Sequence, residues 1–89
     1  MSLIMAASDV ITKMYYKNRI AEILPPLNWY EEQVARMSLE HKEAAARGDD
    51  FSVLQADIIK ARYAQFMWEL RRDLARAIKR LNELERGVL

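Results

Sequence analysis

The sequence predicts an all-α protein of three helices, in which the second and third form a long antiparallel hairpin. Three observations support this. The 89-residue chain is rich in Ala, Leu, Glu, Arg and Lys and holds only 2 Gly and 2 Pro, a composition typical of long helices. Apolar residues recur in steps of three and four along most of the chain. Pro25-Pro26 and Gly48 divide this pattern into three segments.

The first helix is expected at about 8–24, with Ser8 or Asp9 as the N-terminal cap. We expect Pro25-Pro26 to end it, because neither proline donates a backbone hydrogen bond and a residue before proline avoids the helical region. Its apolar stripe consists of Val10, Ile11, Met14, Ala21 and Leu24, widened by Tyr15, Tyr16, Ile20 and Ile23. A stripe this broad is typical of a helix that contacts more than one neighbour.

The second helix is expected at about 29–47. Asn28 followed by Glu31 resembles a capping box, and Gly48 is a natural C-terminal stop. One heptad seam runs along this segment, formed by Leu27, Tyr30, Val34, Met37, His41 and Ala44.

The third helix is expected at about 52–86, because no Gly or Pro interrupts the chain between Ser52 and Arg86. Asp50 or Ser52 is the expected cap. Its main seam consists of Met67, Leu70, Leu74, Ala77, Leu81, Leu84 and Val88, while Leu54, Ile58 and Ala61 form a second set displaced around the helix. The short link after Gly48 predicts an antiparallel hairpin, with facing residue numbers adding to about 99.

The helix lengths leave two topologies open for the first helix. The second helix, roughly 30 Å long, runs out near residue 70 of a third helix that is roughly 50 Å long. The first helix either continues past the Pro-Pro kink and extends the hairpin, or folds back into a compact three-helix bundle. A lone hairpin leaves an apolar side open, so it would form a coiled-coil-like dimer. The length comparison favours this self-associating hairpin.

Composition bounds the protein class. A net charge of +1 and the absence of Cys give no bias toward polyanions and no disulfide framework. The apolar start is too short to span a membrane and lacks a basic segment. We therefore expect residues 1–89 to form a single soluble domain, cytoplasmic and without a membrane partner.

Catalytic and metal-binding patterns are missing from the sequence. We find no nucleophile beside a base, no isolated carboxylate pair and no Gly-rich phosphate loop. A Glu-x-x-His motif ending at His41 would need Glu where the chain has Ser38. We therefore expect neither an enzyme nor a cofactor or metal ion.

Aromatic residues are expected to gather where the second helix ends, from Trp29, Tyr30, Tyr63, Phe66, Met67 and Trp68. Such a group is either the thickest part of the core or a protein-binding surface. Together with the open seam it predicts a small helical protein–protein interaction module, an adaptor, chaperone or assembly accessory. This module would self-associate or bind a helical partner. The candidate contact residues are Trp29, Tyr30, Phe66, Met67, Trp68, Leu70, Leu74, Ile78, Leu81 and Leu84.

The alternative is a nucleic-acid-associated regulator. Arg72, Arg76, Lys79 and Arg80 share one helix face, and such a face can follow a phosphate backbone. The simpler interpretation is a solvated face opposite the apolar seam.

Overall fold

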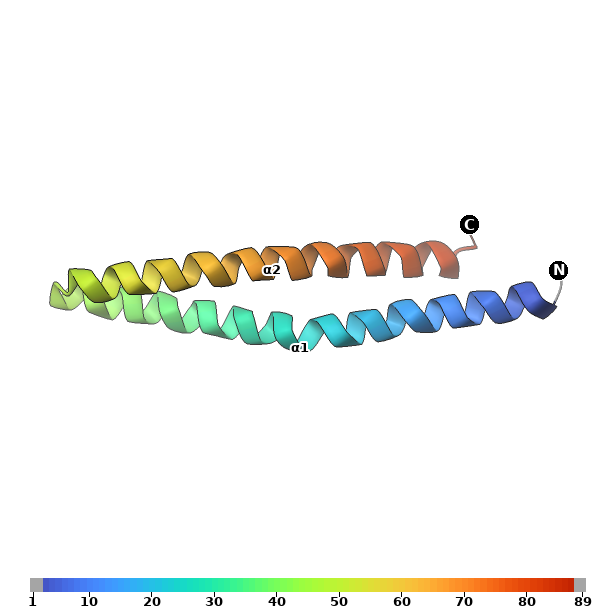
Figure 1. Ribbon diagram of the computed structural model, residues 1–89, viewed down its shortest axis with the longest axis horizontal. Coiled ribbons are helices and arrows are strands. Elements are labelled where there is room, and N and C mark those ends of the chain that lie inside the picture. The colour runs from blue at the N-terminus through green and yellow to red at the C-terminus, as the bar shows by residue number, and fades with distance from the viewer. Residues whose placement is uncertain (1–2, 88–89) are drawn as a thin grey trace.

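Two long antiparallel helices form the whole described fold. The computed structural model describes the backbone of residues 3–87 and the side chains of residues 8–87. Helix α1 spans Leu3–Arg47 and helix α2 spans Asp50–Glu85, with no strand in the described range. They lie side by side as a rod measuring 69 × 18 × 15 Å (Figure 1). The all-α class and the helical hairpin are therefore confirmed.

The expected break at Pro25-Pro26 is wrong, because α1 continues through both prolines. The segment expected as a separate first helix is the N-terminal part of α1. Both prolines are exposed, whereas Ile23 and Leu27 on either side of them are buried against α2. Packing on α2 thus holds the helix together across the missing hydrogen bonds. The prolines bend α1 near its label in Figure 1, as expected of proline inside a helix.

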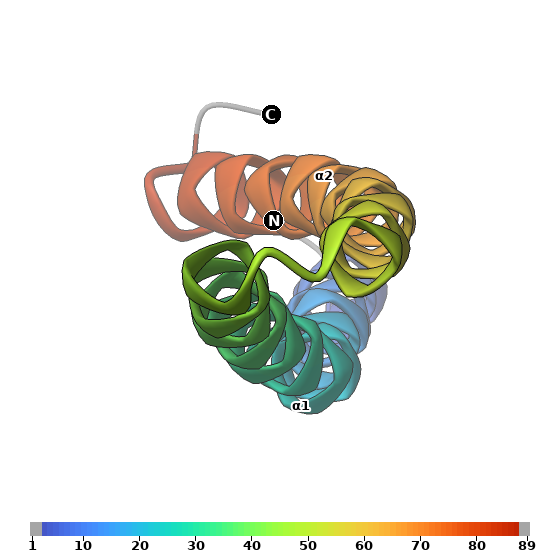
Figure 2. The ribbon, with the colours of Figure 1, turned by 90° about the vertical axis from the view of Figure 1, so that its left-hand side faces the viewer.

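Of the two open topologies, the structure has the extended hairpin and not the compact three-helix bundle. Ion pairs between the helices mark its register along the rod. His41 meets Asp57 near the turn, and Glu31 meets Arg71 farther along. The N-terminal part of α1 then packs beside the C-terminal part of α2. Figure 2 shows the two helices winding around each other, as expected from a seven-residue repeat.

The turn is built from two complementary caps. Gly48 adopts a φ of 70°, and the amides of Gly48 and Asp49 donate to the carbonyls of Ala45 and Ala44, which completes a Schellman motif. Asp49 then caps α2, because its carboxylate accepts from the Ser52 amide at 3.1 Å and from the Ser52 hydroxyl at 2.6 Å. These hydrogen bonds lower the pKa of Asp49. The cap is thus Asp49 and not Asp50 or Ser52.

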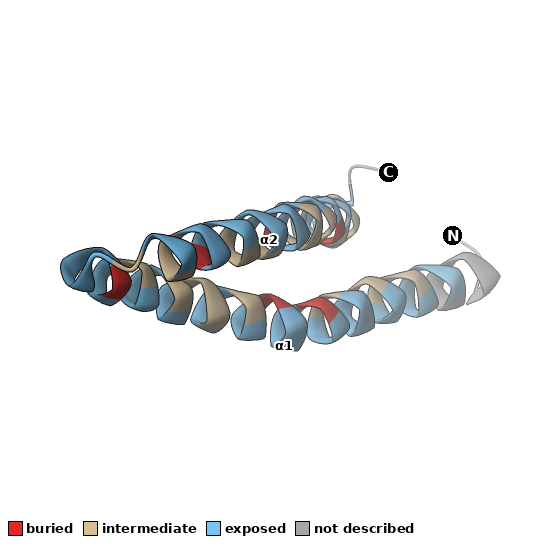
Figure 3. Cartoon of the chain, turned by 60° about the vertical axis from the view of Figure 1, so that its left-hand side comes forward, coloured by how far each residue is buried: buried red, intermediate tan, exposed pale blue. Residues whose placement is uncertain are grey.

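The core is a single layer of side chains between the helices. In α1 it continues the predicted seam back through the prolines, as Tyr16, Ile20, Ile23, Leu27, Tyr30, Val34, Met37, His41 and Ala44, all buried or half-buried. In α2 it comprises Val53, Ala56, Lys60, Tyr63, Met67, Leu70, Leu74, Ala77, Leu81 and Leu84. Val88 lies outside the described residues. Among residues 8–87, only Ile23, Leu27, Ala44, Ala56, Met67 and Ala77 are buried (Figure 3).

Candidate functional site

The predicted contact residues divide into an inward and an outward group. Met67 is buried, and Tyr30, Leu70, Leu74, Leu81 and Leu84 are half-buried on the seam between the two helices of the same chain. The outward group stays exposed, with Trp29 at 48%, Phe66 at 45%, Trp68 at 61% and Ile78 at 41% of their full accessible area. The seam therefore packs mostly inside the hairpin, and the outward group is exposed to solvent.

The structure brings together four of the predicted aromatic residues across the two helices. Ring centroids lie 5.0 Å apart for Trp29 and Tyr30, 5.7 Å for Trp29 and Tyr63, and 5.4 Å for Tyr30 and Phe66. Edge-to-face and stacked contacts at these distances add to the packing of α1 on α2. Trp68 is oriented differently, with the Arg72 guanidinium 5.0 Å from its ring centre.

Two ion pairs define the two sides of the rod. The seam residues occupy positions a and d of the seven-residue repeat. Glu31 and Arg71 are then at position e, and Arg19 and Asp73 are at position g. Glu31 Oε1 lies 3.2 Å from Arg71 Nη2, and Asp73 Oδ2 lies 3.9 Å from Arg19 Nη2. The e positions of both helices thus share one side, and the g positions share the other. Position b adjoins e on a helix, and position c adjoins g.

The side made of e and b positions, which we call the apolar face, is dominated by Ala and larger apolar residues. They are Val10, Met14, Ala21, Leu24, Ala35 and Ala45 of α1, and Leu54, Ala61, Ala64, Trp68, Ala75 and Ile78 of α2, all exposed. Leu54 is 58% exposed and Val10 is 57% exposed. Large apolar side chains therefore reach solvent on this side, at Val10, Met14 and Leu24 of α1 and at Leu54, Trp68 and Ile78 of α2. Others are exposed outside this face, among them Ile11, Phe51 and Ile58 at f positions.

The opposite side, made of c and g positions, is mostly charged. Its ionisable residues are Arg19, Glu22, Arg36, Glu40, Glu43, Arg47, Arg62, Glu69, Asp73, Arg76, Arg80 and Glu83. Trp29 and Phe66 are also on this side, over the aromatic cluster. Charges of both signs alternate along the side, which is typical of a solvent-facing surface.

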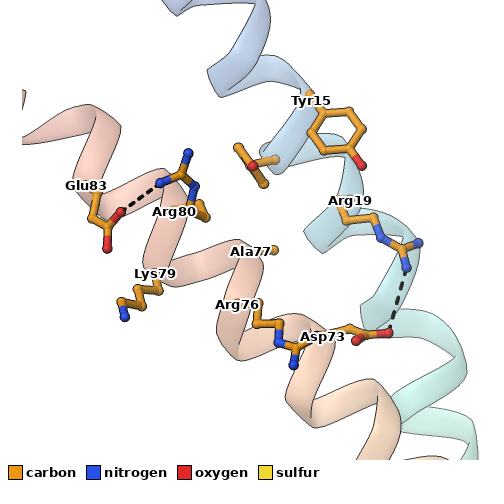
Figure 4. Close-up of a pocket in the computed structure, with 9 residues that line it drawn as sticks. Tyr15, Arg19, Asp73, Arg76, Ala77, Lys79, Arg80 and Glu83 are labelled. Carbon is orange, nitrogen blue, oxygen red and sulfur yellow. Dashed lines mark hydrogen bonds and ion pairs between the residues drawn. The ribbon is translucent and has the colours of Figure 1, made fainter. Parts of the chain in front are cut away.

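A hollow of about 590 Å³ opens on this charged side, near the ends of the two helices away from the turn (Figure 4). Three of the four predicted basic residues, Arg76, Lys79 and Arg80, line it. Glu83 lies 3.2 Å from the Arg80 guanidinium, and the contact of Arg80 with Tyr16 raises its pKa.

The fourth basic residue, Arg72, is not at the hollow. It lies over Trp68, and its Nε is 3.8 Å from the Asp73 carboxylate. The four predicted cations therefore do not form one continuous basic strip, because acidic groups stand beside two of them.

His41 takes part in a cluster of polar side chains between the helices. Its Nδ1 lies 2.8 Å from Asp57 Oδ1, and Lys60 Nζ lies 3.9 Å from the same oxygen. This contact links α1 to α2 beside the single-layer core. Across the described part of the chain, no three His, Cys, Asp or Glu side chains are grouped as a metal site would need.

Most of the apolar face was not among the predicted contact residues. Part of the signal was present in the sequence, since the first predicted stripe contained Val10, Met14, Ala21 and Leu24 and the second contained Leu54 and Ala61. Ile11 and Ile58 belonged to the same stripes but lie at f positions outside the apolar face. The sequence patterns did not give the register between α1 and α2, and this register places both stripes on the same side of the rod.

Comparisons of the chain with known protein families, curated proteins and solved structures found no match. Neither helix, within the described residues, contains an apolar stretch long enough to cross a lipid bilayer.

Proposed function

We propose that this protein is a small helical protein-interaction module that binds its partner through the apolar face. The observation that carries the proposal is the exposure of large apolar side chains at e and b positions. Trp68 is 61% exposed and Leu54 is 58% exposed. Contiguous apolar surface of this kind is typical of protein-binding sites, and Trp is enriched among residues that dominate binding energy.

The shape of the molecule supports the same proposal. The radius of gyration is 19.9 Å, whereas a compact domain of this length would have about 12 Å. The accessible surface is 6771 Å², against about 5,400 Å² for a monomeric protein of this mass. A rod with one layer of core side chains buries little apolar area, and a partner would supply the missing burial.

The alternative, binding of nucleic acid by Arg72, Arg76, Lys79 and Arg80, has weaker support. Asp73 and Glu83 lie beside two of these cations and would repel a phosphate backbone. The apolar face carries fewer charged residues than the charged side, which favours a protein partner.

The test is affinity purification of the tagged protein from its source organism, followed by mass spectrometry and by comparison of two tryptophan variants. Trp68→Ala removes an apolar-face side chain, whereas Trp29→Ala removes an exposed side chain from the opposite side. We expect Trp68→Ala to lose the proteins, or the untagged copies of the chain, that the wild type retains. Trp29→Ala is the matched control and should keep them, provided that circular dichroism shows both variants to be equally helical.

If the wild type retains neither another protein nor a second copy, the proposal is wrong. Equal retention by both variants would also contradict it, because binding would then not use the apolar face.

A further inference from the structure

We infer that the apolar face takes a second copy of this chain, so that two hairpins pack face to face as a four-helix bundle with two-fold symmetry. This inference rests on the proposed function and names its partner. Three independent properties of the rod support it: its excess surface area, the width of its apolar pattern and the charge balance of the face.

The excess surface is larger than the area that a standard dimer interface removes from one chain. The hairpin exposes 6771 Å², about 1,400 Å² more than a folded monomer of its mass. A stable protein–protein interface removes about 800 Å² from each partner. One face along a rod 69 Å long and 18 Å wide offers at least this area. Pairing of two copies through a standard interface would thus remove more than half of the excess surface of each chain.

The apolar pattern has the width of a bundle helix and not that of a two-stranded coil. Two helices that contact only each other need apolar residues at a and d, whereas a helix with two neighbours needs a wider stripe. Beyond its a and d residues, α2 carries Leu54, Ala61, Trp68 and Ala75 at successive b positions, each seven residues apart. The N-terminal half of α1 matches this with Met14 and Ala21. Both helices of one hairpin are therefore patterned for a second neighbour on the same side.

The charge of the face suits a copy of itself. Its basic residues from 10 to 45 and from 54 to 85 are Lys17, Lys42 and Arg71, and its acidic residues are Glu31, Asp57 and Glu85. These charges cancel, and Glu31 and Arg71 already pair within the chain at 3.2 Å. A two-fold axis brings one patch against an identical patch, so a face with net charge would repel itself. A neutral face does not. The charged side is also neutral, but its basic and acidic residues are more numerous, and a contact there would remove more charged groups from water.

Alanine makes close approach of the two copies feasible. Ala35 of α1 and Ala61 of α2 are both exposed at b positions, where neither side chain extends beyond its Cβ. A Glu at position 61 would place a carboxylate within the apolar contact, once from each copy. Because Ala61 is exposed in the single hairpin, the same substitution leaves the hairpin core untouched.

The test is the mass of the full chain in solution by sedimentation equilibrium, at concentrations from about 1 to 200 µM. We expect the wild type to approach twice its chain mass of 10.4 kDa. Ala61→Glu should weaken association at least tenfold while circular dichroism shows unchanged helix content. The matched control is Gln65→Glu, one helical turn farther along α2 at an exposed f position, which adds the same charge away from the face and should leave the association constant unchanged.

Trp68 gives a second measurement. The chain holds two Trp, so Trp29→Phe leaves Trp68 as the only tryptophan. Its emission should shift to shorter wavelength as the concentration rises through the association midpoint, because a Trp that is 61% exposed in one hairpin becomes buried in the pair.

A wild-type mass of one chain at 200 µM would overturn the inference, and so would a dimer that Ala61→Glu leaves intact. The two proposals fail separately. If the chain is a monomer that still retains another protein through Trp68, then the inference of a second copy is wrong and the proposed interaction module stands. If the chain is a monomer that retains no other protein, then both proposals are wrong.

Discussion

Replacing both prolines of α1 with alanine should stabilise the protein, because α1 is one helix through residues 25 and 26. A proline in a helix interior removes the hydrogen bond to the carbonyl four residues earlier, here at positions 21 and 22, and its ring presses against that carbonyl. Both prolines are exposed, so no core packing is lost when the ring is removed. The Pro25→Ala/Pro26→Ala variant would restore two hydrogen bonds and relax the bend.

The expected gain is about 2–4 kcal/mol in the free energy of unfolding. A proline is about 3 kcal/mol less favourable than alanine in a helix interior, but adjacent prolines share one bend, so their costs do not simply add. Each proline also restricts the unfolded chain, and losing this restriction returns roughly 0.4–1 kcal/mol per site. For a domain of this size, each kcal/mol corresponds to a shift of about 4–8 °C in Tm.

The assay is urea and thermal unfolding followed by circular dichroism at 222 nm, at one fixed protein concentration because self-association would contribute to stability. Asn28→Ala serves as the control. Asn28 is exposed two residues after the prolines, and its replacement should gain only about 0.5 kcal/mol from helix propensity.

A double-alanine variant that is less stable than the wild type would refute the reasoning. In that case the prolines would end a helix, as their chemistry alone suggests, and the alanines would remove a turn that the fold requires. A gain no larger than that of Asn28→Ala would also contradict a continuous helix with two unmade hydrogen bonds.

Three further predictions concern the core and the turn. Ile23→Ala should cost about 2–4 kcal/mol in urea unfolding, because Ile23 is 1% exposed, whereas Ile11→Ala at a position 67% exposed should change stability by less than about 0.5 kcal/mol. Gly48→Ala should lower the Tm at a cost of about 1–2 kcal/mol, because a φ of 70° is unfavourable for residues with a Cβ. Hydrogen bonds from Ser52 lower the pKa of Asp49 below 3.8, so the cap stabilises fully above that pH and loses its effect as the pH falls through the folded-state pKa. The stability difference between wild type and Asp49→Ala should therefore shrink in acid unfolding series below about pH 4, and a difference that stays constant to pH 2 would contradict the cap.

Sequence patterns predicted the hairpin well because its determinants are local. Gly48 supplies the positive φ that a Schellman motif needs. The position of the cap was missed by one residue, since Asp49 caps α2 in place of the expected Asp50 or Ser52. The three-four spacing of Met67, Leu70 and Leu74 identified the side of α2 that packs on α1. Such features depend on neighbours within one or two turns, so a single sequence contains them.

The prolines show where local reasoning failed. The rule that Pro25-Pro26 ends a helix considers only the local backbone. Here the packing of α1 on α2 outweighs the cost of the two missing backbone hydrogen bonds. The seam in fact passes unbroken from Ile23 to Leu27 and on to Tyr30, a continuity that was legible in the sequence. This continuity decides between one helix and two only when α2 is known to lie beside α1 and to bury its seam residues.

The sequence by itself determined the helical hairpin, the turn at Gly48 and the seam residues, because these follow from the spacing of apolar residues and from the glycine that ends α1. Only the tertiary structure decided that α1 is continuous, that the Leu70–Leu84 seam is covered by the same chain, and that the stripes around Met14 and Leu54 share one side of the rod. The reason is physical: the side on which a residue lies depends on the register between two helices, and this register is fixed by contacts between residues far apart in the chain, such as Glu31 with Arg71.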